Sequence, residues 1–270
     1  MKVALLISTY NWPEALRSVL VSVGDQSRIP DEILIADDGS GKETERVIEN
    51  FKATINLPIQ HVWQEDKGFR KSAILNKAMA ATGADYIIQV DGDCILHPNF
   101  IEDHLSNIEE GNFLYGSRVN INPGAVKEVL DMETPKFSFF SAAIKNKSRN
   151  LRIPLFQKLY GPKTHFSSKT RGCNLSYWRK DFIAVNGYDE TMEGWGREDS
   201  EFVIRLLNNK IKGKRLRYGG IVYHIYHPEK SREFLERNSE IQKRTIAEKK
   251  VWCREGVDKY LPKNSNEKPS

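Results

Sequence analysis

The stretch from residue 2 to residue 90 alternates between two kinds of hydrophobic pattern. Apolar or alternating runs typical of strands occupy residues 2–8, 31–40, 57–64 and 85–90, and apolar stripes at helical spacing occupy 12–26, 41–53 and 70–83. Parallel neighbours need a crossover connection, usually a helix, which packs on a face of the sheet. The sequence therefore predicts an α/β fold with a mostly parallel central sheet and helices on both of its faces.

The second half of the chain is less regular. A strand is predicted at 112–118, and two short helices are expected at 125–132 and 137–146 within a long segment, 120–168. A connection of that length is usually functional or mobile. A helix is expected to begin close to Glu198, followed by a strand at 219–228 and a helical tail whose last residues are flexible. No repeat or linker divides the chain, so we expect one domain with a C-terminal extension.

Composition narrows the class of protein. A chain of 270 residues with 39% hydrophobic content can bury a large core, and no run approaches the roughly 20 apolar residues of a membrane span. The N-terminus enters a strand without a cleavable signal pattern. Cys94, Cys173 and Cys253 are far apart and form no CxxC pair, so reduced thiols are expected rather than disulfides or structural zinc. These features favour a cytoplasmic protein.

Basic residues crowd one segment, although the formal charge of the whole chain is only +5. They are Lys145, Lys147, Arg149, Arg152, Lys158, Lys163, Lys169 and Arg171. Such a run is usually a solvated face; the alternative is a surface for anionic lipid or for a polyanionic acceptor. Peripheral association with the inner face of a membrane is therefore an open alternative, and no nucleic-acid partner is expected.

Acidic residues follow two of the predicted strands. Asp91 and Asp93 stand one residue apart after a buried run, where two carboxylates repel each other and lose hydration. A hard divalent cation would remove that repulsion, and Gly92 would let a ligand approach the backbone; a turn with solvated carboxylates is the alternative. Asp37 directly follows an apolar run and could accept a hydrogen bond from a flat ring N–H, whereas Ser40 is typical of a turn. Since ligands of parallel sheets bind beyond the carboxyl ends of the strands, a ligand site is predicted there.

Two pairs of basic side chains have two interpretations each. Arg70 and Lys71 open the helix predicted at 70–83 and are either surface cations or partners of phosphate oxygens. His224 and His227 lie three residues apart near the end of the last predicted strand. They are either metal ligands or partly buried polar residues.

The stretch GWGREDSEF, residues 194–202, combines an aromatic ring with two carboxylates. Trp195 lies between two glycines, and Glu198 and Asp199 stand at a helix start, where the dipole favours ionised carboxylates. An ionised carboxylate can take a proton from a sugar hydroxyl while the apolar face of the sugar stacks on the ring. A capping pair beside a core tryptophan is the alternative.

Six motifs taken in order resemble the family 2 glycosyltransferases of the GT-A fold. They are STYN, DEILIADDGS, GFRKSAILNKA, YIIQVDGD, RGCNLSYWRKDF and GWGREDSEFVIRL. The second half is similar to the galactosyltransferase-like and chondroitin-polymerase-like branch. The resemblance implies a GT-A domain at 1–228, with a nucleotide-sugar-binding half at 1–118 and an acceptor and catalytic half at 119–228, and a helical extension with a flexible tail at 229–270.

The resemblance also implies roles for individual residues. Thr9 and Asp37 would lie at the nucleotide base with Arg70 nearby, Asp91 would contact the sugar or ribose, and Asp93 would bind Mn²⁺ or Mg²⁺ on the diphosphate of a UDP-sugar. His224 matches a histidine that completes the metal site in this branch, and His227 is a competitor for that role. Asp199 matches the catalytic base, and Trp195 and Glu198 match acceptor contacts. This chain departs from the pattern at Arg197, where a second glycine is common.

The implied function is that of an inverting, metal-dependent glycosyltransferase. It would move a sugar from a nucleotide-diphosphate donor to a hydroxyl of a glycan or lipid-linked acceptor, as in surface polysaccharide biosynthesis. One alternative is a sugar-1-phosphate nucleotidyltransferase, although the N-terminal stretch lacks the Gly-rich phosphate loop that such an enzyme needs. A second alternative is a catalytically silent carbohydrate-binding or assembly protein.

Overall fold

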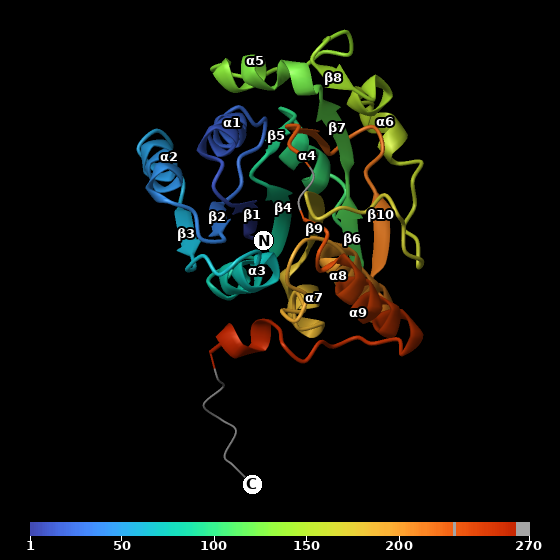
Figure 1. Ribbon diagram of the computed structural model, residues 1–270. Coiled ribbons are helices and arrows are strands. Elements are labelled where there is room, and N and C mark those ends of the chain that lie inside the picture. Colours follow the sequence, from blue (N-terminus) through green and yellow to red (C-terminus); the bar gives the residue numbers. More distant parts are fainter. Residues whose placement is uncertain (229–230, 263–270) are drawn as a thin grey trace.

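A seven-stranded sheet forms the centre of the molecule. The computed structural model describes residues 1–228 and 231–262. The strand order is β10-β6-β9-β4-β1-β2-β3, and only β9 among these strands runs antiparallel to its neighbours. The strands are β1 (Val3–Thr9), β2 (Glu32–Asp37), β3 (Ile59–Trp63), β4 (Tyr86–Asp91), β6 (Asn112–Tyr115), β9 (Asn174–Trp178) and β10 (Lys212–Arg215). The predicted mostly parallel sheet is confirmed, and both halves of the chain contribute strands to it (Figure 1).

Helices cover both faces of this sheet, as predicted (Figure 1). The α-helices are α1 (Pro13–Gly24), α2 (Lys42–Lys52), α3 (Lys71–Ala80), α4 (Phe100–Leu105), α5 (Val126–Asp131), α6 (Pro154–Gln157), α7 (Arg179–Ala184), α8 (Glu198–Asn208) and α9 (Leu235–Ala247). Three 3₁₀ turns, η1 (Pro123–Ala125), η2 (Lys147–Asn150) and η3 (Val257–Tyr260), complete the described helical elements.

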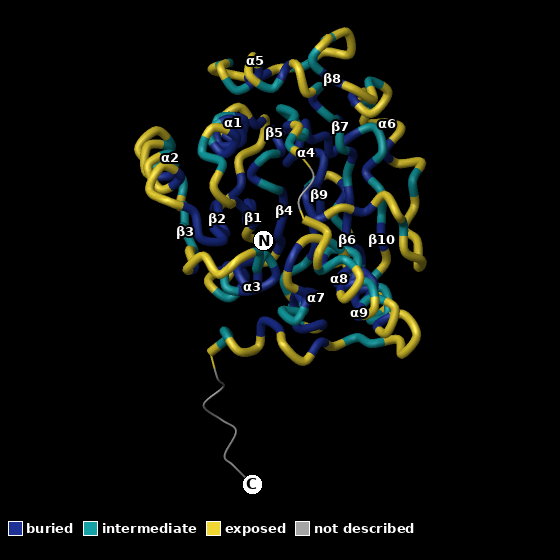
Figure 2. Tube along the Cα trace, in the orientation of Figure 1, coloured by how far each residue is buried: buried dark blue, intermediate teal, exposed yellow. Residues whose placement is uncertain are grey.

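Two hydrophobic cores follow from the alternation of side chains along each strand. Leu5 of β1 belongs to the same core as Leu16 of α1, whereas the next residue, Leu6, belongs to the core that contains Ile74 of α3. Successive side chains of a strand point to opposite faces, so one strand supplies both cores. β1 and β2 are consequently buried along their whole length (Figure 2).

A second sheet lies beside the first and carries one end of the candidate site. Its four strands have the order β5-β11-β7-β8, with β5 (Cys94–Leu96), β11 (Ile221–His224), β7 (Ser117–Ile121) and β8 (Ile144–Lys145). β11 is antiparallel to β5 and pairs His224 with Cys94. This register brings the end of the last strand next to the residue that precedes Cys94.

The long segment after β7 differs from expectation in one helix. The helix expected at 125–132 is present as α5, but the helix expected at 137–146 is wrong, because that stretch contains a turn and the short strand β8. The ring of Phe137 packs on Tyr223 with their centroids 4.5 Å apart, and Ser138 N donates to Ser141 Oγ at 2.9 Å. The contact of Phe137 with the body of the protein and the local turn at Ser138 override the helical preference of the segment.

The same segment is anchored by a buried carboxylate. Arg152 Nε donates to both oxygens of Asp103 at 3.0 and 3.1 Å, and Gln157 Nε2 donates to Asp103 Oδ1 at 3.1 Å. A buried charge is tolerated only when it is paired and hydrogen-bonded, as this one is. The segment is therefore fixed on the body around residues 152–157.

The C-terminal extension is helical, as predicted, and packs on α8. Thr245 Oγ1 donates to Glu201 Oε1 at 2.9 Å, and Asn208 Nδ2 donates to the carbonyl of Lys250 at 2.7 Å. The flexible tail expected at the end of the chain lies at 263–270, outside the described residues. Cys94, Cys173 and Cys253 are all free and buried, in agreement with reduced thiols. Among the described helices, none has the length and apolar character needed to cross a bilayer.

Candidate active site

The carboxyl ends of β1, β2 and β4 meet at one edge of the large sheet. The register pairs Thr9 with Asp37 and Ser8 with Asp91. Parallel neighbours end at the same edge, so three residues expected at the donor, Thr9, Asp37 and Asp91, lie side by side. This edge is where a ligand of such a sheet is expected.

Asp37 is buried and already has two protein partners. Its Oδ1 accepts a hydrogen bond from Ser40 N at 2.8 Å, and its Oδ2 lies 2.9 Å from His61 Nε2. Asp37 thus fixes the turn at Ser40, in agreement with the turn interpretation of that serine. A nucleotide base would have to share one of these oxygens.

Gly92 gives space to the neighbouring strand β1. A β-carbon at this position would lie 3.1 Å from the carbonyl oxygen of Ser8 and 3.1 Å from Cβ and Oγ1 of Thr9. The backbone nitrogen of Gly92 donates to Ser8 O at 2.7 Å. The missing side chain therefore makes room for Thr9, and the approach of a ligand to this backbone stays a prediction.

Arg70 is held beside β2 at the start of α3. Its backbone nitrogen donates to Asp38 Oδ2 at 2.8 Å, and its guanidinium donates to the carbonyl of Glu65. Gln64 Nε2 donates to the other oxygen of Asp38 at 2.6 Å. Burial raises the pKa of Asp38 against the effect of these hydrogen bonds.

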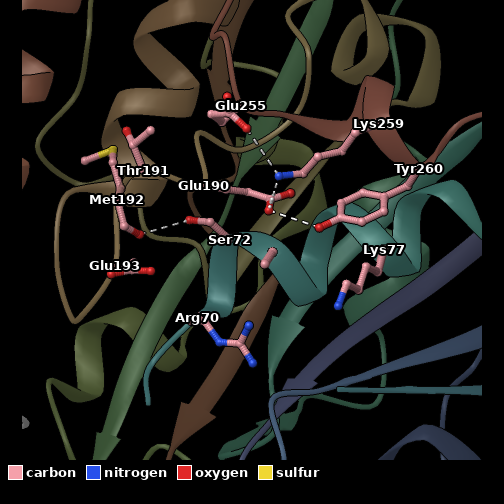
Figure 3. Close-up of a pocket in the computed structure, with 11 residues that line it drawn as sticks. Arg70, Ser72, Lys77, Glu190, Thr191, Met192, Glu193, Glu255, Lys259 and Tyr260 are labelled. Carbon is pink, nitrogen blue, oxygen red and sulfur yellow. Dashed lines mark hydrogen bonds and ion pairs between the residues drawn. The ribbon is translucent and has the colours of Figure 1, made fainter. Parts of the chain in front are cut away.

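Arg70 also lines a cavity of about 200 Å³ between α3 and the C-terminal segment (Figure 3). Inside it, Lys259 Nζ lies 2.7 Å from Glu190 and 3.6 Å from Glu255, and Tyr260 Oη donates to Glu190 at 3.0 Å. In Figure 3 the Arg70 side chain extends away from this cluster. Since the charges of the cluster are paired with each other, it ties the C-terminal segment to the body of the protein.

Lys71 lies between the carboxylates expected on the donor side and those expected on the acceptor side. Its Nζ lies 2.7 Å from Asp91 Oδ1, which also accepts a hydrogen bond from Ser8 Oγ at 2.8 Å. Burial alone would lower the pKa of Lys71, but the charges of Asp91, Asp199 and Glu198 outweigh it and hold that pKa well above its usual value. One partly buried ammonium therefore compensates both groups of carboxylates.

Asp93 lies at the centre of a second cluster with both candidate histidines. Its Oδ2 is 3.5 Å from His224 Nε2 and 3.3 Å from His227 Nε2. One ligand atom from each of the three residues lies within 4.8 Å of the others. The structure therefore places His224 and His227 together rather than choosing one of them.

The cluster fits a divalent metal. One carboxylate oxygen and two imidazole nitrogens suit Mn²⁺ as well as other transition metals, and all three side chains are partly exposed, which leaves coordination positions for a ligand. Burial lowers the pKa of His224 in spite of the nearby Asp93 charge, and the neutral imidazole is the form that binds metals. Asp93, His224 and His227 are the residues that would hold the ion.

Glu198 and Asp199 begin α8, as predicted, and are held by backbone amides. Glu198 Oε2 accepts a hydrogen bond from Gly196 N at 3.0 Å, and Asp199 Oδ2 accepts one from Gly172 N at 2.9 Å. Oδ1 of Asp199 is buried and has no hydrogen-bond partner among the described residues. An unpartnered buried carboxylate oxygen is costly unless a ligand supplies the partner.

The ionisation of these two carboxylates differs from expectation. Burial, and then the charge of Asp199, raise the pKa of Glu198 to about 7. Burial also raises the pKa of Asp199, although Lys71 opposes it. Burial outweighs the interactions that favour the charged form of Glu198, so the expectation that both carboxylates are ionised does not hold for Glu198 below about pH 7.

The Trp195 loop is positioned from both sides. Gly194 N donates to the carbonyl of Phe69 at 3.0 Å, while Trp195 itself stays 40% exposed, as an aromatic platform requires. Arg197 adopts a left-handed backbone with φ of 78°, which explains why glycine is common at this position. Its Nε donates to Ser239 Oγ of α9 at 3.2 Å, so the guanidinium is directed to α9.

Helix α9 holds this loop in place, which the sequence did not indicate. The buried Asn238 donates from Nδ2 to the carbonyls of Glu193 at 2.9 Å and Gly196 at 3.0 Å. The ring of Phe234 occupies the space where a side chain on Gly194 would lie. Nothing in the local pattern of the helical tail marks Asn238 as a partner of a loop about forty residues earlier, and only the packing of α9 reveals it.

The comparisons with known proteins agree with this geometry. Residues 4–183 match glycosyl transferase family 2, and residues 155–228 match the N-terminal domain of galactosyltransferase. The first match covers well over half of the chain. The two matches together contain all the candidate site residues described above.

Two curated relatives and one solved structure illustrate the similarity. Chondroitin synthase of Escherichia coli is 26% identical over 85% of this chain, and hyaluronan synthase of Pasteurella multocida is 25% identical over 85% of it. The chain spans only 35% and 25% of the length of those two proteins. The crystal structure of GalNAc-T7 with UDP, GalNAc and Mn²⁺ superposes with a TM-score of 0.61 at 19% identity, covering 85% of this chain and 44% of that one. By its sequence and its fold, the chain belongs to glycosyl transferase family 2 and has the GT-A fold.

Proposed function

We propose that this protein is an inverting, metal-dependent glycosyltransferase that uses a UDP-sugar and glycosylates a hydroxyl of a glycan or lipid-linked acceptor. The observation that carries the proposal is the convergence of two groups of carboxylates on Lys71. Asp91 pairs with Lys71 at 2.7 Å, and the charges of Asp199 and Glu198 raise the pKa of the same ammonium. Donor and acceptor would therefore meet beside this lysine.

The donor side is supported by the metal-compatible cluster. Asp93, His224 and His227 present three ligand atoms within 4.8 Å of one another, near the strand ends that carry Thr9 and Asp37. GalNAc-T7, which shares the fold, was solved with UDP and Mn²⁺. A divalent cation held by the three side chains would supply positive charge that stabilises the diphosphate as it leaves.

The acceptor side is supported by the state of Asp199. One of its oxygens is fixed by Gly172 N, and the other has no partner among the described residues. In the proposed step Asp199 accepts the proton of the acceptor hydroxyl while that oxygen attacks the anomeric carbon. The bond from that carbon to the phosphate oxygen breaks, and its electron pair leaves with UDP.

Inversion follows from a single displacement with one base. Glu198, whose pKa is about 7, is proposed to hold the acceptor by hydrogen bonding, and Trp195 to stack on a sugar ring. Arg70, beside the end of β2, is proposed to lie near the nucleotide. An α-linked donor would then give a β-glycoside.

A membrane-bound acceptor is favoured by the surface of the long segment. Phe140, Leu155 and Leu159 are 85%, 71% and 75% exposed there, and Lys147 and Lys158 lie among them in the sequence. Exposed apolar side chains with basic neighbours suit an anionic lipid surface. We therefore propose that the protein works at a membrane and, like the polysaccharide synthases to which it is similar, on a growing glycan.

A screen of nucleotide sugars tests the proposal. Thermal unfolding is followed with each nucleotide sugar, with UDP and with GDP, in Mn²⁺ or in EDTA. A ligand that binds only the folded state raises the melting temperature, and at a fixed concentration a tighter ligand raises it further. Metal-dependent stabilisation by UDP and by one UDP-sugar is expected. Equal stabilisation in EDTA would contradict the metal site, and stabilisation by no nucleotide would contradict the function.

A further inference from the structure

A cavity of about 270 Å³ lies at the same edge of the large sheet as the candidate site, but towards its other end. Gly116, which joins β6 to β7, bounds it together with Ser117 and Arg118 of β7. The other boundaries are Arg215 and Arg217 at the end of β10 and Asn174 at the start of β9. β6 and β10 are parallel, and β9 is antiparallel to β6, so the ends of β6 and β10 and the start of β9 meet at one edge.

The charged side chains that line this cavity are all positive. Six cationic side chains line it, and no lining residue is acidic. They are Arg118, Arg149, Lys169, Arg171, Arg215 and Arg217. In the described part of the chain, none of the six has a carboxylate partner within ion-pair distance. Lys71 in the candidate site, by contrast, is paired with Asp91 at 2.7 Å.

The cations act on one another. Burial, followed by the charges of Arg217 and Arg149, lowers the pKa of Arg215. Arg149 and Arg171 donate to backbone carbonyls, Arg149 to that of Arg118 at 3.1 Å and Arg171 to that of Thr170 at 2.7 Å. Carbonyls orient a guanidinium without neutralising it, so an anion in the cavity would relieve the repulsion.

The cavity lies on the acceptor side of the candidate site. β10 is separated from β4 by β6 and β9, which puts its end about 14 Å from that of β4 at the usual strand spacing. Arg171, on the near wall, precedes Gly172, whose amide holds Asp199, and the charge of Arg171 acts on that carboxylate. The wall formed by Arg215 and Arg217 is therefore far from Asp91, while the near wall adjoins the proposed base.

We propose that this cavity binds an anionic group of the acceptor, a phosphodiester or a carboxylate, while the hydroxyl to be glycosylated lies at Asp199. This inference rests on the proposed function and adds the class of acceptor, an anionic glycan or a glycan phosphate. Planar guanidinium groups match the paired oxygens of either anion. The unpaired cations thus select against neutral acceptors.

Direct binding of small anions tests the inference without an identified acceptor. Thermal unfolding of the full chain is measured with sodium phosphate, with sodium glucuronate and with sodium chloride at equal ionic strength, each with and without saturating UDP and Mn²⁺. We expect phosphate or glucuronate to raise the melting temperature more than chloride does. This extra stabilisation should persist when UDP and Mn²⁺ are bound. Greater stabilisation by phosphate would indicate a phosphodiester in the acceptor, and greater stabilisation by glucuronate would indicate a carboxylate. Loss of the effect on adding UDP and Mn²⁺ would assign the cavity to the donor diphosphate and overturn the inference.

Matched variants test whether the anions bind in this cavity. Arg215→Gln and Arg217→Gln should each weaken anion binding by about tenfold or more, because each loses charge-assisted hydrogen bonds, and should keep metal-dependent stabilisation by UDP. Lys127→Gln, an exposed change on α5 outside the cavity, should behave as the wild type. Arg217 is the less enclosed of the two arginines, so its variant remains informative if Arg215→Gln does not fold. Wild-type anion binding in both variants, or no anion binding by the wild type, would overturn the inference.

Failure of the proposed function has a different signature. If UDP and Mn²⁺ do not stabilise the wild type but phosphate does, the donor assignment fails and the anion cavity stands. If UDP and Mn²⁺ stabilise the wild type and neither anion does, the cavity assignment alone fails.

Discussion

Gly172 and Asp199 are packed so closely that no side chain can exist between them: a β-carbon on Gly172 would lie 1.9 Å from Oδ1 of Asp199. The amide of Gly172 also donates to Oδ2 of that carboxylate at 2.9 Å. The backbone just before β9 therefore both holds the proposed base and leaves it space. A residue that touches no substrate in the proposed mechanism is thus tied to catalysis.

Gly172→Ala should displace Asp199 and lower the transfer rate. A shift of about 1 Å in a reacting group costs on the order of 10²-fold in rate, so kcat should fall by about that factor while stabilisation by UDP and Mn²⁺ persists. Gly124→Ala is the matched control, because a β-carbon there meets open space. Wild-type kcat in Gly172→Ala, measured with radiolabelled donor, would mean that the position of Asp199 does not matter.

The raised pKa of Glu198 should make stability depend on pH. Because its pKa is about 7 in the folded protein against an ordinary 4.5, this group contributes stability that is full below about pH 4.5 and is lost as the pH rises through about 7. The loss should be on the order of 3 kcal/mol in the unfolding free energy. Urea unfolding across this range, without metal or nucleotide, should show a flatter profile for Glu198→Gln than for the wild type or for the exposed control Glu236→Gln. Parallel profiles for all three proteins would contradict the burial of this charge.

Both histidines beside Asp93 should contribute to metal binding. His224→Ala and His227→Ala should each weaken the Mn²⁺-dependent stabilisation by UDP by about tenfold or more, because each removes one of three clustered ligand atoms. The exposed His165→Ala serves as the control. Loss in only one of the two variants would show that the other histidine is a neighbour of the site and not a ligand.

Helix α9 should control the acceptor loop from a distance. Asn238→Ala removes the two hydrogen bonds to the carbonyls of Glu193 and Gly196, so the Trp195 loop should be less well positioned. The acceptor KM should rise while the affinity for UDP and Mn²⁺ is unchanged; the exposed Arg237→Ala controls for changes on the same helix. An equal loss of nucleotide affinity would indicate general destabilisation in place of loop positioning.

The sheet and its covering helices could be predicted because local patterns determine them. Each strand from β1 to β4 is a short apolar or alternating run, and each intervening stretch has helical spacing. The period of the hydrophobic pattern and the order of the elements are therefore enough to predict this half of the sheet. The helix expected at 137–146 failed for the opposite reason: its apolar residues, such as Phe137, pack on the distant Tyr223 instead of forming a stripe. A pattern within one segment cannot report a contact made across the chain.

In the candidate site, too, some residues could be predicted from the sequence and others could not. Asp91, Asp93 and Asp199 stand out in the sequence because carboxylates at strand and helix ends are conspicuous. The role of Lys71 could not be inferred, because its charge is shared among carboxylates that are over one hundred residues apart in the sequence. The ionisation of Glu198 could not be inferred from the sequence either, since burial, the main cause of its raised pKa, is a property of the folded chain.

The central claim, that Asp199 is the base of a glycosyl transfer, is tested most directly by the kcat of Asp199→Asn. Asparagine keeps the size of the side chain and a carbonyl oxygen that can accept the Gly172 amide, but it cannot take a proton from the acceptor. With the wild-type donor and acceptor, kcat should fall by roughly 10² to 10⁴ while UDP and Mn²⁺ bind as before. Glu198→Gln, the matched control, should chiefly raise the acceptor KM, and slow hydrolysis of the donor by water should survive in both variants. A transfer rate near that of the wild type in Asp199→Asn would contradict the account and place the base elsewhere.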